Sequence, residues 1–340
     1  MSPIPEQLPP CEGPKLKKFP YHNSTIQWLE RLDENREDDD VTSIQGYVFK
    51  ARIGGREYAV KVFKFFDPMS TEYAWGPQLG EDTSLDTAAY YTDPFYAECR
   101  AYGQMREAIE KNILKKDVAV PCHGFFFLKT KDQKTLQNRN IDLGLDLVDM
   151  DNQRSAIGGR RARAIVKDLA SSNSGITSTS IRKILSKVVL MNKAGIYNMD
   201  IRIGNFCDGQ LIDFGSSWTE PHALLASLSR EAAAESKLAD RVMFNHMAEN
   251  AGLKNCGEGQ QSITSNMRRT RASVSTLLIS VLVEIDISSQ RSMKPVVSHN
   301  STCVMDPLGL PAPWPGDALA SLCILAKGQQ NSARFATRYL

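Results

Sequence analysis

Apolar and polar positions alternate in two neighbouring stretches, and this pattern predicts a β-hairpin. The stretches are residues 46–51 and 58–65, and the Gly54-Gly55 pair between them suits a tight turn. In the second stretch, one strand face would carry Ala59, Lys61, Phe63 and Phe65. Lys61 would therefore lie among apolar residues and need an anionic partner, because burying an unpaired ammonium is costly.

Apolar residues at helical spacing follow and predict one long helix. Asp93 and Pro94 suit the N-cap and the first position of a helix that runs to about Ile113. Glu98 would sit beside the buried stripe of this helix, which makes it the candidate partner of Lys61. Considered alone, a glutamate at such a position is more often a solvated carboxylate.

The segments around these elements show weaker patterns. Residues 1–40 are rich in Pro, Glu and Lys and predict a flexible tail, with one amphipathic patch near 26–32 that could dock as a helix. Residues 67–91 lack periodicity and predict an inserted loop. A short strand at 164–169 then leads into Ser-, Asn- and Gly-rich residues, as expected of a connection between two lobes.

Two helical regions are expected in the second half of the chain. The first has Thr179 or Ser180 as its cap and Gly195 as its terminator. The second covers about residues 222–251 and has a wide apolar face. Beyond it the pattern fades, so residues 253–340 form a region for which the sequence predicts no defined fold.

The segment between these two regions carries the candidate chemistry. Asp200 begins a D-x-x-x-x-N motif that ends at Asn205, and Asp213 opens an Asp-Phe-Gly motif. Gly209 suits a tight hairpin turn that would bring the two aspartates and the asparagine together. Phosphoryl transfer needs a base near the acceptor hydroxyl, here Asp200, and oxygen ligands for Mg²⁺, here the other two residues.

Composition narrows the class of protein. Of the 340 residues, 42% are hydrophobic, which supplies a sizeable core and excludes a disordered chain. The formal net charge of +2 gives no signature of a nucleic-acid or membrane-surface protein. The 7 cysteines form no C-x-x-C pair, which indicates free thiols in a reducing compartment. Apolar runs are too short to span a bilayer, so a cytoplasmic or nuclear location is expected.

The order of these features resembles the protein-kinase superfamily. The resemblance implies that Lys61 contacts the phosphates of ATP and that Glu98 is its helix partner. It implies that Asp200 is the catalytic aspartate. Asn205 and Asp213 would bind magnesium.

The resemblance also implies a fold. It covers roughly residues 41–250 and implies an α+β, protein-kinase-like fold of two lobes. A small β-rich N-lobe with one long helix would occupy 41–168, and a reduced, mostly α-helical C-lobe would occupy 169–252. Gly46 and Asp168 would also contact the ATP.

Three segments carry a narrower resemblance. Residues 58–65, 97–103 and 200–206 look like a fungal kinase-like family that includes a kinetochore subunit. This resemblance implies protein partners in a multisubunit assembly, in addition to Mg-ATP.

The chain departs from the kinase pattern in several places. Val41 and Ser43 stand where the kinase glycine-rich loop has glycines, and Asn198-Met199 replaces the histidine and arginine before the catalytic aspartate. No Ala-Pro-Glu follows Asp-Phe-Gly, and only residues 216–221 separate this motif from the next helix. This spacing leaves little platform for a protein substrate.

Three functions are compatible with the sequence. The leading hypothesis is an atypical phosphotransferase that binds Mg-ATP, because five separated polar residues all persist. The second is a nucleotide-binding pseudokinase that serves as a scaffold, which the missing glycines and missing platform favour. The third is a structural kinetochore or chromatin subunit with a vestigial pocket. Retained ligands permit catalysis without showing that it occurs.

Overall fold

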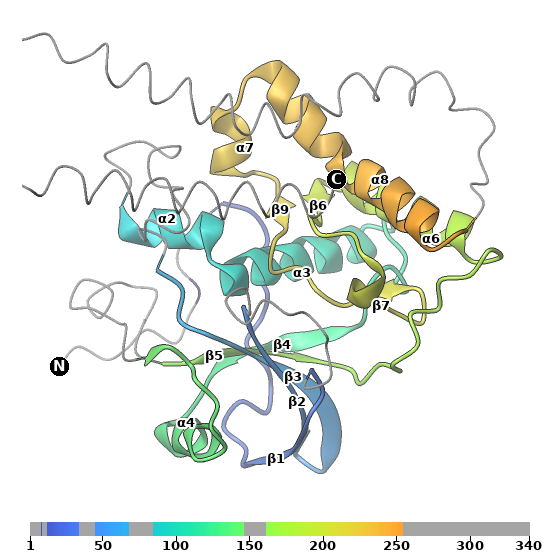
Figure 1. The fold of residues 1–340 in the computed structure, drawn as a ribbon. Coiled ribbons are helices and arrows are strands. Elements are labelled where there is room, and N and C mark those ends of the chain that lie inside the picture. The colour runs from blue at the N-terminus through green and yellow to red at the C-terminus, as the bar shows by residue number, and fades with distance from the viewer. Residues whose placement is uncertain (1–7, 9–11, 34–44, 68–83, 146–160, 254–340) are drawn as a thin grey trace, which may run out of the picture. The chain divides into compact units, whose positions relative to one another are not determined.

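The N-terminal half of the described chain is built on an antiparallel sheet (Figure 1). The computed structural model describes residues 8, 12–33, 45–67, 84–145 and 161–253, all within one compact unit, Met1–Cys256. Within these residues the sheet has the strand order β1-β2-β3-β5-β4. The strands are β1 (Ile26–Arg31), β2 (Gly46–Ile53), β3 (Arg56–Phe63), β4 (Cys122–Phe127) and β5 (Arg163–Lys167). Because helices dominate the part that follows, the predicted α+β class is confirmed.

The hairpin predicted near the start of the chain forms as β2 and β3. Its register runs from Gly46 opposite Phe63 to Ile53 opposite Arg56. Gly54 and Gly55 make the turn with φ of 58° and 83°, which is the region where glycine is favoured. Lys61 lies opposite Val48 in this hairpin and opposite Ile165 of β5 on its other side.

The prediction of a flexible tail over 1–40 with a docked helix near 26–32 is wrong for the described part. Residues 26–31 form β1, an edge strand that pairs with β2. Trp28 is buried and its ring packs edge-on against Phe49, with ring centroids 5.4 Å apart. The helical interpretation required Leu32 on the buried side, but Leu32 is 44% exposed. The apolar side chains that face the sheet's core recur at every second residue, as they do in a strand.

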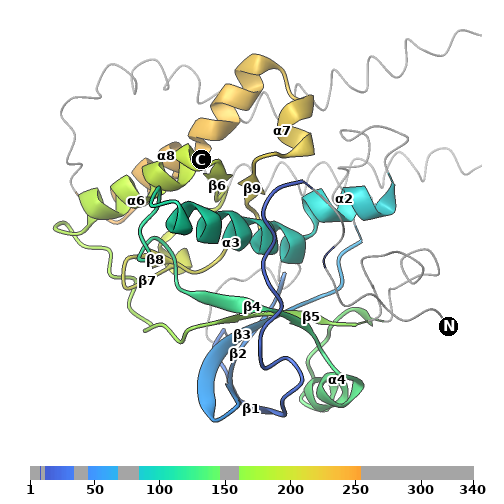
Figure 2. The ribbon, with the colours of Figure 1, turned by 180° about the vertical axis from the view of Figure 1, so that it is seen from behind.

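An N-terminal segment, residues 14–19, lies across the long helix and β4. Figure 2 shows it in dark blue, crossing α3 (Pro94–Glu110) and the sheet. A Cβ added to Gly103 would come within 2.7 Å of the Pro14 carbonyl oxygen. A Cβ on Gly124 would come within 2.6 Å of the Lys17 carbonyl oxygen. Both glycines therefore permit a close backbone approach that holds α3 and β4 together.

Helix α3 begins at the predicted residue and packs on one face of the sheet. The Asp93 carboxylate accepts a hydrogen bond from the Phe95 amide at 2.8 Å and pairs with the buried Arg163 of β5 at 2.5 Å. Part of the loop predicted for 67–91 is also a helix, α2 (Leu85–Thr92), which Ser84 caps. The sequence analysis predicted a loop here because the Ser84 cap is the only strong helix signal of α2. The rest of the predicted loop, residues 68–83, lies outside the described residues.

The remaining elements place the candidate motifs between α6 and α7, in loops and a 3-10 turn beside short strands. They are α4 (Thr130–Gln137), α6 (Ile181–Lys193), β6 (Ile196–Tyr197), η3 (Ile203–Asn205), β7 (Phe206–Cys207), β8 (Gln210–Leu211), β9 (Trp218–Thr219), α7 (Ala223–Ser227) and α8 (Arg230–Asn250). The region predicted as one helical stretch over 222–251 is thus two helices, because Leu228 has an extended backbone and Ser229 caps α8.

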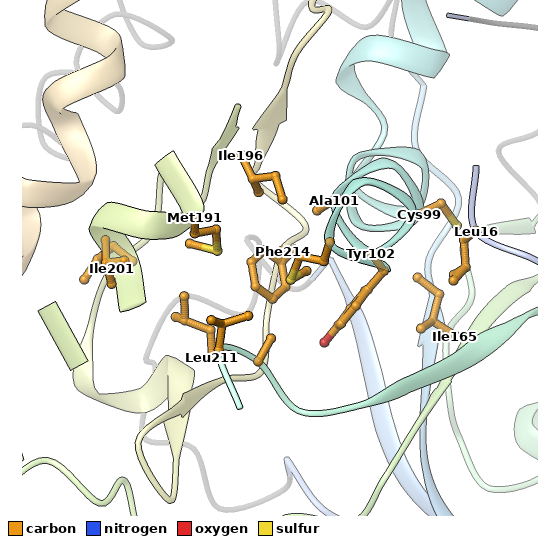
Figure 3. Close-up of a cluster of buried hydrophobic side chains, with 14 of the residues drawn as sticks. Leu16, Cys99, Ala101, Tyr102, Ile165, Met191, Ile196, Ile201, Leu211 and Phe214 are labelled. Atoms are coloured by element: carbon orange, nitrogen blue, oxygen red, sulfur yellow. The ribbon is translucent and has the colours of Figure 1, made fainter. Parts of the chain in front are cut away.

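The core runs between the sheet, α3 and the C-terminal helices. Figure 3 shows Phe214 between Tyr102 of α3 and Met191 of α6. The Phe214 and Tyr102 rings meet edge-on with centroids 5.2 Å apart, and Phe214 is fully buried. The domain boundaries predicted after residues 40, 168 and 252 stay predictions. Residues 254–340, which make up nearly all of the predicted C-terminal region, lie outside the described residues. No helix in the described part is long and apolar enough to cross a membrane.

Candidate functional site

Lys61 lies at the centre of a buried polar cluster. It is 5% exposed, and its Nζ lies 3.0 Å from Glu98 Oε2 and 2.7 Å from Asp213 Oδ1. Burial would lower the pKa of Lys61, but the two carboxylates outweigh it and raise that pKa. Lys61 therefore keeps its positive charge. Its two ion pairs bring together β3, α3 and the Asp-Phe-Gly segment.

Glu98 also contacts a second lysine, which the sequence analysis missed. Lys167 ends β5, is 6% exposed and pairs with Glu98 Oε1. Its Nζ also donates a hydrogen bond to the Ile212 carbonyl oxygen at 2.6 Å. Each oxygen of the fully buried Glu98 carboxylate thus faces its own ammonium. The sequence held one sign of this role: side chains two apart on a strand share a face, which puts Lys167 on the same sheet face as Ile165.

Asp213 is held as an anion. Burial alone would raise its pKa, but Lys61 and Lys167 hold that pKa well below its usual range. The Gly215 amide also donates a hydrogen bond to Asp213 Oδ1 at 2.9 Å. A carboxylate that keeps its charge at all ordinary pH values is suited to bind a cation.

Asp200 and Asn205 meet on the neighbouring loop. The predicted hairpin forms as β7 and β8, with Asp208 and Gly209 at positive φ in its turn. Asn205 Nδ2 donates hydrogen bonds to the Asp200 carbonyl oxygen and to Asp200 Oδ2, both at 2.8 Å. Burial raises the pKa of Asp200, and Arg202, whose Nε is 3.3 Å from Oδ2, opposes that rise. A carboxylate with a raised pKa accepts a proton more readily.

Asp240 of α8 fixes the backbone of this loop and was also missed from the sequence. It is fully buried, and its carboxylate accepts hydrogen bonds from the Asn198 amide, the Met199 amide and the side chain of Asn192. Met199 has a φ of 63°, so these bonds hold a conformation that most residues avoid. The Asn198 side chain in turn donates to the Asp213 carbonyl oxygen at 2.6 Å.

Two residues expected to contact ATP have other contacts. The Asp168 carboxylate is bound by Arg56 at 2.6 Å and by His123 at 2.7 Å. A Cβ at Gly46 would lie 2.3 Å from the Val62 carbonyl oxygen, so the pairing of β2 with β3 already requires a glycine there. Neither observation places these residues with the Lys61 cluster, and their contact with nucleotide stays a prediction.

The chain after Asp-Phe-Gly is tied directly to α3. Ser217 Oγ donates to the Ala97 carbonyl oxygen at 3.2 Å, and Arg100 donates to the carbonyl oxygens of Thr219, at 2.5 Å, and Pro221. Strand β9 then pairs with β6. Residues 216–221 thus form a short connection to α7, and the lack of a platform for a protein substrate stays a prediction.

His222 follows this connection and makes the stability of the fold pH-dependent. Burial and then the charge of Arg100 lower the pKa of His222 from its ordinary value near 6.5 to about 3. As pH falls below 6.5, the unfolded chain binds a proton at this position while the folded chain does not, so folding becomes less favourable. We expect a loss of about 4 kcal/mol between pH 6.5 and about 3.

Urea unfolding at stepped pH measures this loss. The variant His222→Phe keeps a ring against Trp218, with which His222 stacks at a centroid distance of 5.2 Å, and removes the titration. Its unfolding free energy should depend less steeply on pH over this window. The same slope in both proteins would contradict the assignment to His222.

Asn205 and Asp213 each offer an oxygen atom of the kind that Mg²⁺ accepts. Asn205 is fully buried, and because its Nδ2 faces Asp200, its Oδ1 is left without a hydrogen-bond partner. Asp213 supplies a charged carboxylate, and carboxylate and amide oxygens are ligands that Mg²⁺ accepts. The described residues hold no group of three His, Cys, Asp or Glu side chains suited to a metal ion. The ion would therefore need further oxygen ligands from phosphates and water, as is usual for magnesium on nucleotides.

Comparisons with known proteins give a family and distant structural likenesses. A family model described as "Kinetochore Sim4 complex subunit FTA2" matches residues 4–218. The search of curated proteins found no match. Among solved structures, a vaccinia related kinase 3 matches with 10% sequence identity and a TM-score of 0.30 over 62% of this chain. The chain covers 53% of that kinase, about half its length.

Proposed function

We propose that this chain, which belongs to the FTA2 family of kinetochore Sim4 complex subunits, is a kinase-like scaffold subunit that binds Mg-nucleotide. The family description supports protein partners in a multisubunit assembly and a nuclear location. The pairing of Lys61 with both Glu98 and Asp213 is the observation that carries the nucleotide part.

The buried cluster supports a phosphate site for a physical reason. A lysine held between two carboxylates keeps its charge in a poorly solvated place, where attraction to a phosphate is stronger than in water. When bound, magnesium neutralises charge on the nucleotide phosphates. Asn205 Oδ1 and the Asp213 carboxylate are the atoms that would hold the ion.

The short connection after Asp-Phe-Gly favours the function of a scaffold rather than that of a protein kinase. Arg100 and Ser217 fasten this connection to α3, so α3 and Glu98 are held in place without any activating event. A rigid α3 suits a subunit whose shape is recognised by partners.

Thermal unfolding with and without Mg-ATP tests nucleotide binding. At a hundredfold excess over Kd, Mg-ATP should stabilise the full chain by about 2.7 kcal/mol, because it binds only the folded protein. The variant Lys61→Met should lose this stabilisation. Lys64→Met is the matched control, because Lys64 follows the same strand but pairs with Asp142 at 3.5 Å, outside the cluster. Unchanged unfolding of the wild type in saturating Mg-ATP would contradict the nucleotide part and leave family membership intact.

Phosphotransfer is a second candidate function, favoured by the geometry of Asp200. Its side chain is 38% exposed while Asn205 behind it is fully buried, so an acceptor hydroxyl could reach the carboxylate. Asp200 would then accept the hydroxyl proton as the hydroxyl oxygen bonds to the γ-phosphorus of ATP and ADP leaves.

A further inference from the structure

We propose that Lys167 is a second cation of the phosphate site and lets this site bind the phosphate chain of a nucleoside triphosphate without a magnesium ion. The inference rests on the proposed function, because it concerns the same nucleotide site. Lys61 is the first cation, and Glu98 lies between the two lysines.

Strand register explains how two lysines reach one carboxylate. Lys61 of β3 lies opposite Ile165 of β5, and Lys167 lies opposite Ala59. Residues two apart on a strand share a face, so Lys61 and Lys167 are diagonal neighbours on one side of the sheet. This is the side that faces α3, because both lysines pair with Glu98.

Lys167 frees Lys61 to bind a phosphate. Removing a partner from a fully buried carboxylate is costly, so a Glu98 with one lysine would hold that lysine in place. Here Lys167 pairs with the other oxygen of Glu98, so Glu98 would keep a cationic partner if Lys61 moved. Lys61 can therefore exchange its bond to Asp213 for a bond to phosphate while Glu98 stays neutralised.

The charge balance of the cluster leads to the same conclusion. The ammonium groups of Lys61 and Lys167 face the carboxylates of Glu98 and Asp213, so these four side chains together carry no net charge. Without Lys167 the cluster would be an anion. An anionic cluster repels a nucleotide unless a metal ion neutralises it, whereas a neutral one does not.

Calorimetric titration of the full chain with ATP in Mg²⁺ and with ATP in EDTA tests this inference. For the wild type, the Kd in EDTA should exceed the Kd in Mg²⁺ by less than about 10-fold. In Lys167→Met that ratio should be at least about 10-fold larger, because one buried unit charge is lost. Lys167→Arg, which keeps the charge, should retain the wild-type ratio, and so should Lys64→Met.

The outcomes separate this inference from the proposed function. A wild type that binds Mg-ATP but not ATP in EDTA overturns the role of Lys167 and leaves the proposed function standing. An equal ratio of the Kd in EDTA to the Kd in Mg²⁺ in wild type and Lys167→Met also overturns the role of Lys167. Absence of binding in both buffers overturns both proposals. If Lys167→Met does not fold, the two wild-type titrations and Lys167→Arg still decide.

Discussion

Replacing Asp240 by alanine should destabilise the fold by about 3–5 kcal/mol. The Asp240 carboxylate accepts bonds at 2.7 Å from Asn192 Nδ2 and at 2.8 Å from each of the Asn198 and Met199 amides; the first two bonds are buried and the third is partly buried. Alanine leaves the buried Asn198 amide and the partly buried Met199 amide without this acceptor, and each unsatisfied buried group costs about 1–3 kcal/mol. The left-handed backbone at Met199 would then lose its support.

Chemical denaturation of the two proteins measures this effect. Asp240→Asn is the informative control, because its single carbonyl oxygen still accepts from the loop and burial already raises the pKa of Asp240, disfavouring its charge. We expect the asparagine variant to lose less than half as much stability. An alanine variant within about 0.5 kcal/mol of the wild type would show that α8 does not support the loop.

The variant Asp200→Asn should lower phosphotransfer from ATP by at least about 100-fold. Asparagine can still accept the hydrogen bond from Asn205 Nδ2, so the loop is preserved, but it cannot take a proton from an acceptor hydroxyl. Nucleotide binding should survive, because the Lys61 cluster is unaltered. The readout is transfer of labelled γ-phosphate to the chain itself or to co-purified proteins.

Asp208→Asn is the matched control for this prediction. Asp208 lies in the adjacent hairpin turn, is exposed and bonds to Ser171 Oγ at 2.6 Å, outside the site. Equal transfer by wild type and Asp200→Asn would assign the activity to a contaminant. A wild type that binds Mg-ATP but transfers nothing would remove the second candidate function and leave the scaffold.

The sequence predicted those parts of the site that depend on local patterns. Period-two alternation placed Lys61 on a buried strand, and the Asp93-Pro94 pair marked the start of α3. Once these two elements pack, Glu98 is the carboxylate that α3 presents to Lys61. The turn at Gly209 likewise set the hairpin that follows Asn205.

The residues that were missed owe their roles to partners distant in sequence. Asp240 lies among many charged residues of α8, and nothing in its neighbours shows that it accepts bonds from a loop 41 residues earlier. Lys167 stands at the end of a short strand, and its partner Glu98 belongs to another element. Leu29 of β1 and Leu32, which follows that strand, resembled a helical stripe, because a strand of six residues is too short for its alternation to exclude a helix.

Two anchors, one at the start of α3 and one further along it at Arg100, link the fold to the proposed function. Arg163 pairs with Asp93 at the start of α3, where both side chains are at most 5% exposed, and Arg100 holds the segment after Asp-Phe-Gly. Because breaking a buried pair costs about 3–5 kcal/mol, α3 should not swing away from β3 at ordinary temperature. Glu98 is then permanently placed, which suits a binding subunit more than a switched enzyme.

A crystal structure of the full chain with Mg²⁺ and a non-hydrolysable ATP analogue would show directly whether the Lys61 cluster binds a nucleotide. We expect a magnesium ion about 2.0–2.1 Å from Asn205 Oδ1 and from an oxygen of Asp213. We also expect that Lys61 Nζ has moved from Asp213 to a phosphate oxygen while Lys167 still pairs with Glu98. Lys61 remaining on Asp213, with the analogue absent or bound elsewhere at saturating concentration, would contradict nucleotide binding by this cluster.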